Sequence, residues 1–143
     1  MALTWSLQSN APQEDLAIIS NGVLSYGRTH SKDGNSEPIS CLVRSEGAVV
    51  AGASGRTEYA RLFINYLWVS EALRKNGIAR RILIEIESAA ARRGCRDSLI
   101  ETLDESVAGL YARLGYQTVT IIRGYVGHFN RHIMLKPSLG PAK

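Results

Sequence analysis

Apolar and polar residues follow two different periods along the chain. Apolar residues recur every three or four positions at residues 12–26 and again at residues 77–93, a spacing typical of amphipathic helices. Between these segments, the stretch RLFINYLWV at residues 61–69 is apolar on both faces and rich in aromatic and β-branched residues. Such a run predicts a central strand that is covered on two sides.

The remaining segments predict further strands and one short helix. Short runs bounded by glycine and polar residues predict strands at residues 3–8, 39–44, 49–54, 97–103, 117–122 and 128–135, and a short helix at residues 107–114. A strand, a helix and a second strand over residues 61–103 imply one right-handed parallel crossover. The predicted fold class is therefore α+β, a mixed sheet with helices packed on it.

The length of 143 residues is that of one domain, which can bury about two-thirds of its unfolded surface in a single core. We expect residues 1–143 to form this domain. Its N-terminal part, residues 1–38, is expected to be variable and to hold one helix and a polar loop, and residues 39–136 are expected to form the core.

The composition excludes several classes of protein. A hydrophobic fraction of 45% with 21% charged residues is typical of soluble globular proteins, and the apolar runs are too short to cross a bilayer. Residues 1–20 lack a basic start, an apolar core and a small-residue cleavage site. We therefore expect a cytoplasmic protein with no membrane partner.

The cysteines and histidines predict no metal site. Cys41 and Cys95 have no histidine at metal-ligand spacing beside them, so both are expected to be reduced thiols. His128 and His132 would share one face of a predicted strand, but the sequence offers them no third ligand.

The stretch LRKNGIARR, which leads into the second helix, carries charges of unfavourable sign. Its four cations are Arg74, Lys75, Arg80 and Arg81. A helix N-terminus has a partial positive charge, so each cation there costs roughly 0.3–1 kcal/mol. An anion bound to unpaired main-chain N–H groups would reverse this effect, and Gly77 would let the main chain approach it closely. The alternative is that all four side chains simply point into solvent.

Two motifs in this half of the chain resemble one known family. The spacing Arg74-x-x-Gly77-x-Ala79 resembles the acetyl-CoA pyrophosphate loop of the GNAT superfamily of N-acetyltransferases, usually written Arg/Gln-x-x-Gly-x-Gly/Ala. Farther along, the stretch GLYARLGY resembles the Tyr-x-x-x-Gly-Phe/Tyr element of that family. The resemblance covers residues 40–136. The family usually places two helices between its first two strands, whereas this sequence predicts one.

This resemblance implies that acetyl-CoA, as co-substrate, lies between the strands at residues 61–69 and 97–103. The main chain of Leu67, Trp68 and Val69 would pair with the pantetheine arm like an added strand, and one of their N–H groups would polarise the thioester carbonyl. The cofactor phosphates would bind the segment that consists of Arg74, Lys75, Asn76, Gly77, Ile78, Ala79 and Arg80.

The resemblance also implies two catalytic roles. Tyr111 matches the family's tyrosine on the short helix and would protonate the departing thiolate, although a buried tyrosine is often a core residue. Tyr116 is assigned to packing. Glu101 is the first candidate for the base that takes a proton from the amine, and its alternative role is to hold a loop or the substrate's ammonium group.

Other polar residues are expected near the acceptor. Asn65 lies in the middle of the central strand, where relatives often carry an acid, and its amide cannot act as a base. Glu71 or a water molecule therefore stays an alternative to Glu101. Asp104 could recruit a cationic acceptor, and His128 could contact the substrate from the last strand.

The expected function is transfer of an acetyl group from acetyl-CoA to a primary amine of a small molecule, by direct attack and without a metal. The alternative is a non-catalytic protein of the same fold that binds acetyl-CoA as a sensor. A nucleic-acid-binding protein, suggested by a pI near 9.3, is disfavoured because basic and aromatic residues are not interleaved. A homodimer is expected only because folds of this type often dimerise.

Overall fold

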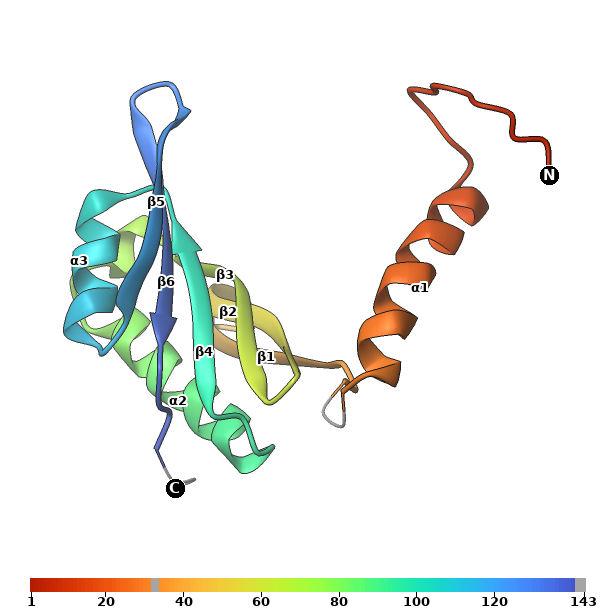
Figure 1. Ribbon diagram of the computed structural model, residues 1–143. Helices are drawn as coiled ribbons and strands as arrows, with labels where there is room; N and C mark the ends of the chain where they lie inside the picture. Colours follow the sequence, from red (N-terminus) through yellow and green to blue (C-terminus); the bar gives the residue numbers. More distant parts are fainter. Residues whose placement is uncertain (32–33, 141–143) are drawn as a thin grey trace. The chain divides into compact units, whose positions relative to one another are not determined.

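The computed structural model describes residues 1–31 and 34–140 (Figure 1). The chain divides into two compact units, Met1–Gly34 and Asn35–Lys143. Their boundary lies within the N-terminal part, residues 1–38, that the sequence separates from the core. That the whole chain forms one domain stays a prediction.

The first unit contains the helix α1 (Gln13–Thr29) and an irregular N-terminal segment. Glu14 and Asp15 lie in the first turn of α1, where carboxylates interact favourably with the helix dipole. The strand predicted at residues 3–8 is wrong, because these residues form no regular structure. A strand needs a partner for its main-chain N–H and C=O groups, and no described residue of this unit supplies one.

The described part of the second unit is built on a six-stranded mixed sheet with the strand order β1-β2-β3-β4-β6-β5. Among these strands, β3 and β4 are the one parallel pair, as the predicted crossover requires. This sheet confirms the α+β class. The strands are β1 (Glu37–Ser45), β2 (Ala48–Glu58), β3 (Arg61–Val69), β4 (Asp97–Thr102), β5 (Gln117–Val126) and β6 (Phe129–Lys136).

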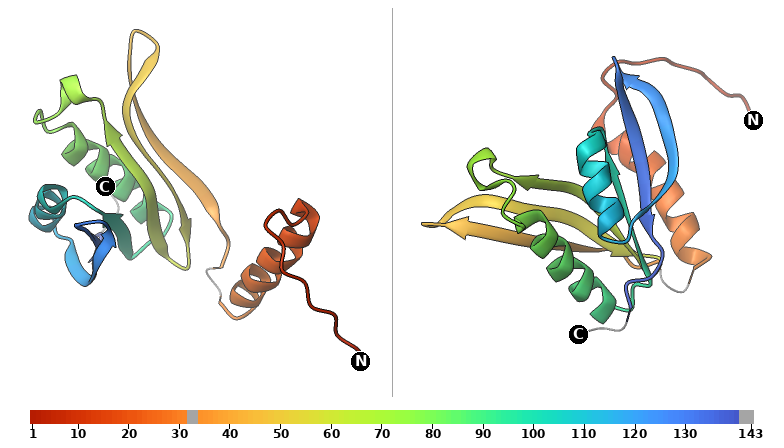
Figure 2. Two further views of the ribbon diagram at one scale, coloured as in Figure 1. Left: turned by 90° about the horizontal axis from the view of Figure 1, so that it is seen from above. Right: turned by 90° about the vertical axis from the view of Figure 1, so that its left-hand side faces the viewer.

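Two helices, α2 (Ile78–Arg92) and α3 (Glu105–Arg113), cover the same face of this sheet (Figure 2). A short 3₁₀ turn, η1 (Glu71–Leu73), precedes α2. Ile82 and Ile86 of α2 are buried together with Leu62 of β3 and Met134 of β6. Neither α2 nor α3 covers the opposite face, so these helices provide one of the two covering layers predicted for β3.

The parallel pairing of β3 and β4 ends early. Residues 61–63 pair with residues 97–99, and beyond this point the two strands separate. On its other edge, β3 contains a bulge, because Ile64 and Tyr66 are opposite the neighbouring residues Gly55 and Ser54 of β2. Asn65 is the extra residue of this bulge, and a bulge bends the strand that carries it. The two strands therefore splay apart where the resemblance places the cofactor.

A buried polar network holds the helix layer on the sheet. The Tyr116 hydroxyl donates to Oε2 of Glu87 on α2 at 2.9 Å and lies 2.8 Å from Oγ of Ser98 on β4. Nζ of Lys136 on β6 donates to Oε1 of the same glutamate at 2.8 Å. Burial, together with the Glu87 carboxylate, raises the pKa of the Tyr116 hydroxyl. Tyr116 therefore links α2 to β4, and Lys136 links α2 to β6, in keeping with the assignment of Tyr116 to packing.

We expect Tyr116→Phe to destabilise the protein because it leaves buried polar atoms of Glu87 and Ser98 without a partner. The expected loss is about 1–3 kcal/mol of unfolding free energy, measured by urea denaturation. Tyr66→Phe is the matched control, since the Tyr66 side chain is 77% exposed and its loss of a hydroxyl should change stability by less than about 0.5 kcal/mol. Equal effects of the two substitutions would contradict a structural role of the network.

Candidate functional site

A cavity of about 710 Å³ lies where β3 and β4 separate, on the face of the sheet that carries the helices. The end of β3, the loop before α2, the first turn of α2 and one side of α3 line it. Its lining includes these residues predicted from the sequence: Leu67, Trp68, Val69, Arg74, Lys75, Gly77, Ile78, Ala79, Arg80, Asp104 and Tyr111. Residues that are up to 44 positions apart in the sequence, 67 and 111, thus meet at one site.

The main chain at the end of β3 has an unpaired edge at this cavity. Ser70 N–H donates to the carbonyl of Val50 on β2 at 2.9 Å. Because main-chain groups alternate in direction along a strand, those of Leu67 and Val69 point to the opposite edge, toward the separation from β4. The Val69 carbonyl there accepts a hydrogen bond from Nε of Arg74 at 2.9 Å. An extended ligand could therefore pair with this edge.

The loop between η1 and α2 has a main-chain conformation suited to an anion. Lys75 and Gly77 both have positive φ, 64° and 74°, and such turns can direct successive N–H groups toward one point. The Asn76 side chain folds the loop, because its Nδ2 donates to the carbonyls of Leu73 and Arg74 at 3.2 and 3.1 Å. Asn76 itself lines a second cavity, of about 610 Å³, between β1 and α2. It is the one predicted donor-site residue outside the first cavity.

The first turn of α2 has neither a capping side chain nor an acidic residue. Within residues 1–31 and 34–140, the N–H groups of Ile78, Ala79 and Arg80 find no hydrogen-bond acceptor. These are the groups that bind phosphate or carboxylate at helix N-termini.

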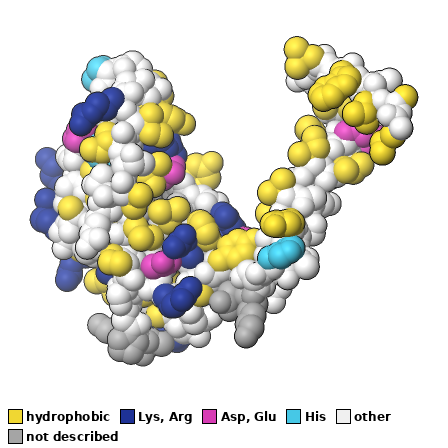
Figure 3. Space-filling model, viewed as in Figure 1, with side chains coloured by type: hydrophobic (Ala, Val, Ile, Leu, Met, Phe, Trp, Pro, Cys, Tyr) yellow, Lys and Arg dark blue, Asp and Glu magenta, His cyan; other side chains and the backbone are white. Residues whose placement is uncertain are grey.

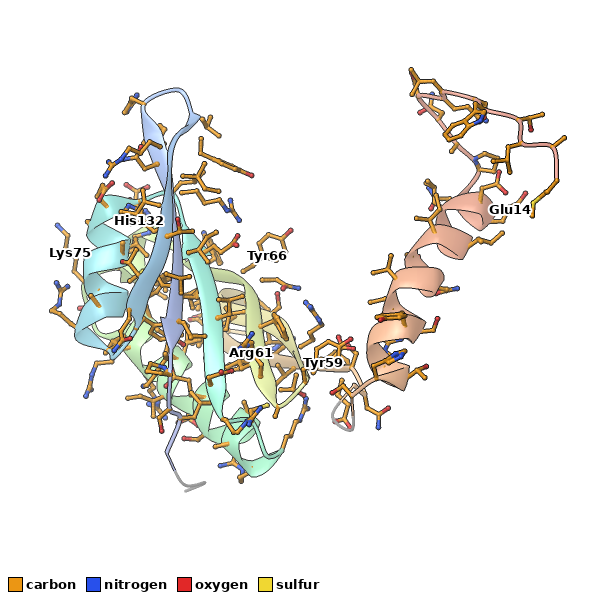
Figure 4. All side chains as sticks on the ribbon, viewed as in Figure 1. Glu14, Tyr59, Arg61, Tyr66, Lys75 and His132 are labelled. Carbon is orange, nitrogen blue, oxygen red and sulfur yellow. The ribbon has the colours of Figure 1, made fainter. Side chains whose placement is uncertain are left out.

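The cations of this loop divide into two sets. Arg74, Lys75 and Arg80 line the first cavity, whereas Arg81 lines the second and lies 3.9 Å from Glu85 of α2. Lys and Arg side chains gather along the edge of the molecule beside α3, where Lys75 lies (Figures 3 and 4). Three of the four cations thus line the cavity beside the loop before α2.

Arg113 of α3 also lines the first cavity, and the sequence did not predict it. An arginine in the last turn of a helix is common, because it interacts favourably with the helix dipole. Only the fold shows that this side chain faces the cavity.

Tyr111 presents a protonated phenol to the cavity. The residue is 3% exposed, and burial raises the pKa of its hydroxyl to about 12. This hydroxyl has no hydrogen-bond partner in the part of the chain that the structure describes. Tyr111 therefore lines the cavity with a hydroxyl that no described residue engages.

Glu101 lies on the face of β4 opposite to this cavity. Its neighbour Ile100 points toward the helices, so the Glu101 side chain points away from them. Nε of Arg131 on β6 donates to Oε2 of Glu101 at 2.8 Å, and Nη2 of the same arginine donates to the same oxygen. If the β3–β4 register is continued by two residues, Asn65 stands opposite Glu101 across the separation. The sequence predicted Glu101 and Asn65 for this place, but not Arg131.

The remaining predicted substrate-binding residues have structural contacts. Asp104 caps α3, since its Oδ1 accepts hydrogen bonds from the N–H groups of Ser106 and Val107 at 2.8 and 3.2 Å. The hydrogen bonds from Ser106 and Val107 lower the pKa of the Asp104 carboxyl. His128 lies between β5 and β6 and packs against Phe129, with ring centroids 4.2 Å apart and the two ring planes tilted by 32°. Their contact with a substrate stays a prediction.

His132, which is 5% exposed, faces α3 from β6. Its Nε2 lies 2.9 Å from Oε1 of Glu105, and this contact lowers the pKa of the Glu105 carboxyl. In the described ranges, no three His, Cys, Asp or Glu side chains gather in a way that could hold a metal ion. No described helix is long and apolar enough to span a membrane.

Comparisons with known proteins point to one kind of enzyme. The sequence model of the Acetyltransferase (GNAT) family matches residues 7–116. The chain is 25% identical over 118 residues to acetyltransferase Atu2258 of Agrobacterium fabrum, an alignment that covers 82% of this chain and 86% of that protein. It is 30% identical over 91 residues to the blasticidin-S acetyltransferase of Streptomyces morookaense, with 63% and 67% covered.

A solved structure is also similar. The crystal structure of an acetyltransferase from Bacillus cereus superposes with a TM-score of 0.82 at 25% identity, and the match covers 92% of this chain and 96% of that chain. The same fold therefore occurs in acetyltransferases.

Gly77→Ala tests the main-chain conformation of the loop before α2. No atom lies within 4 Å of the added methyl group, so the expected cost comes from the positive φ alone and is about 1–2 kcal/mol of unfolding free energy. Gly109→Ala in α3 is the control, because its methyl group meets only the end of the Arg113 side chain at 3.6 Å. It should be neutral or stabilise by up to about 1 kcal/mol. A Gly77→Ala protein as stable as the control would show that the loop adapts freely.

Proposed function

Because the chain belongs to the acetyltransferase (GNAT) family, we propose that it transfers the acetyl group of acetyl-CoA to a primary amine of a small molecule by direct attack. The single cavity that combines a free strand edge, unpaired helix N–H groups and Tyr111 carries this proposal. A small acceptor is supported by the relative that is 30% identical, which is named for acetylating blasticidin S.

The loop and the two helices would hold the donor. Its pyrophosphate would accept hydrogen bonds from the N–H groups of Ile78, Ala79 and Arg80, in a field made positive by the surrounding cations. The pantetheine arm would pair with the edge of β3 that Leu67 and Val69 present. One of these two N–H groups would then donate to the thioester carbonyl and stabilise the negative charge that develops on its oxygen.

The chemical step would need two proton transfers by side chains. The amine nitrogen attacks the thioester carbon and becomes more acidic as the new C–N bond forms, so Glu101 can take its proton. The C–S bond then breaks, and Tyr111 gives its phenolic proton to the leaving sulfur. Because Tyr111 is protonated at neutral pH, it already carries this proton before acetyl-CoA binds.

A direct assay tests the proposed function. The protein is incubated with acetyl-CoA and a panel of primary amines, the release of the CoA thiol is followed, and the acetylated amine is identified by mass spectrometry. Turnover with an amine supports the proposal. Binding of acetyl-CoA without turnover of any amine would favour the sensor instead.

Adjacent arginines of α2 provide a matched pair for the donor site. Arg80→Gln should weaken acetyl-CoA binding roughly tenfold, because Arg80 lines the donor cavity and the variant loses a charged hydrogen-bond donor. Arg81→Gln removes the same charge one residue later, where the side chain faces Glu85, and should weaken binding by less than about twofold. Isothermal titration calorimetry measures both. Equal losses would mean that only net charge matters at this helix.

Tyr111→Phe should lower kcat by roughly 10²-fold while the dissociation constant of acetyl-CoA stays the same, because the phenyl ring keeps the packing and only the proton is lost. With a pKa of about 12, Tyr111 stays protonated between about pH 7 and 10. The ratio of wild-type to variant kcat should therefore be constant over this range. A ratio that falls as the pH rises would indicate a much lower pKa, and an unchanged kcat would remove Tyr111 from the chemistry.

A further inference from the structure

Resting on the proposed amine acetylation, we infer that the acceptor carries a carboxylate beside its amine, and that Glu101 and Arg131 bind these two groups. The acceptor class is then an amino acid or a molecule that contains an amino-acid unit. The ammonium group binds Glu101, and the carboxylate binds Arg131.

The hydrogen bonds of the Glu101–Arg131 pair leave one group of each partner unused. Nε and Nη2 of the guanidinium both donate to Oε2 of Glu101. A closed fork, in contrast, uses both oxygens of the carboxylate. Within the described residues, Oε1 of Glu101 and Nη1 of Arg131 therefore have no protein partner. Oε1 of Glu101 can therefore accept a hydrogen bond from an ammonium group, and Nη1 of Arg131 beside it can donate one to a carboxylate.

The pair stands where an acceptor would arrive. Glu101 lies two residues beyond the last paired position of β4, at the start of the separation from β3. The donor cavity occupies the helix side of the sheet, so the opposite face is the side from which an amine can reach the thioester. The Glu101 and Arg131 side chains are 35% and 31% exposed, which leaves both accessible to a small molecule.

Tyr125 fixes the orientation of the arginine. The Arg131 guanidinium lies over the Tyr125 ring, 5.0 Å from its centroid, so one face of the planar group is covered. A guanidinium held in this way presents its remaining N–H groups in one direction, which suits a planar carboxylate.

The charges of the pair also disfavour other acceptors. A plain amine gains attraction from Glu101 but meets the positive charge of Arg131 beside it. In a molecule with both an ammonium and a carboxylate group, the ammonium meets Glu101 and the carboxylate meets Arg131, so each group faces a partner of opposite charge. Discrimination between acceptors therefore comes from repulsion of the wrong one as well as attraction of the right one.

Pairs of acceptors that differ only in the carboxylate test the inference. Glycine, β-alanine and γ-aminobutyrate are compared with their amides, so that the spacing of the two groups is sampled. For the best spacing, wild-type kcat/KM should favour the carboxylate by at least about tenfold, because the amide leaves Arg131 without its partner. Arg131→Gln should bring this ratio close to one, and Arg131→Lys, which keeps the charge, should restore part of it.

Arg61→Gln is the control for loss of an ion pair from the same region of the sheet. Arg61 binds Asp97 through two hydrogen bonds of 2.7 and 3.0 Å at the paired end of β3 and β4, so its loss should leave the ratio unchanged. Acetylation of acids and amides at equal rates by the wild type overturns the inference and leaves the proposed function intact. If Arg131→Gln does not change the ratio, the inference is likewise overturned and the proposed function stays intact. Absence of acetylation in both series, and with every other primary amine, overturns the proposed function, and the inference with it.

Discussion

The early end of the β3–β4 pairing is the constraint on which the site depends. Only three residues of each strand pair in parallel, and the bulge at Asn65 bends β3 away from its neighbour. The unpaired main chain of β3 is the feature that a packed sheet normally eliminates, because exposed N–H and C=O groups need partners. Here the separation leaves one edge of β3 unpaired beside the cavity.

The helix layer holds the N-terminus of α2 and one side of α3 in fixed positions around this opening. The crossover from β3 to β4 places the N-terminus of α2 at the end of β3, and α3 begins directly after β4. Apolar burial by itself is not directional. The hydrogen bonds of Tyr116 to Glu87 and of Lys136 to the same carboxylate are directional, so they fix α2 against the sheet.

The parts that local pattern determines were predictable from the sequence. The periodicity identified β3 and α2, and Gly77 and the neighbouring cations drew attention to the loop that lines the cavity before α2. The prediction of a strand at residues 3–8 failed, because strand formation depends on a partner that the local pattern does not reveal. Arg131 was missed for a similar reason: its contact with Glu101 spans 30 positions and follows from the register between β4 and β6. No periodicity within either strand reveals that register.

The loop before α2 carries a free-energy cost that packing does not explain. Lys75 adopts a positive φ, which costs a non-glycine residue about 1–3 kcal/mol, and Arg74 and Arg80 add positive charge at the positive end of the helix dipole. These three side chains are exposed, so burial does not offset the cost. A bound anion leaves the backbone strain unchanged but reverses the sign of the charge effect. If the loop binds the donor as proposed, binding would regain part of this free energy and would thereby couple folding to occupancy of the site.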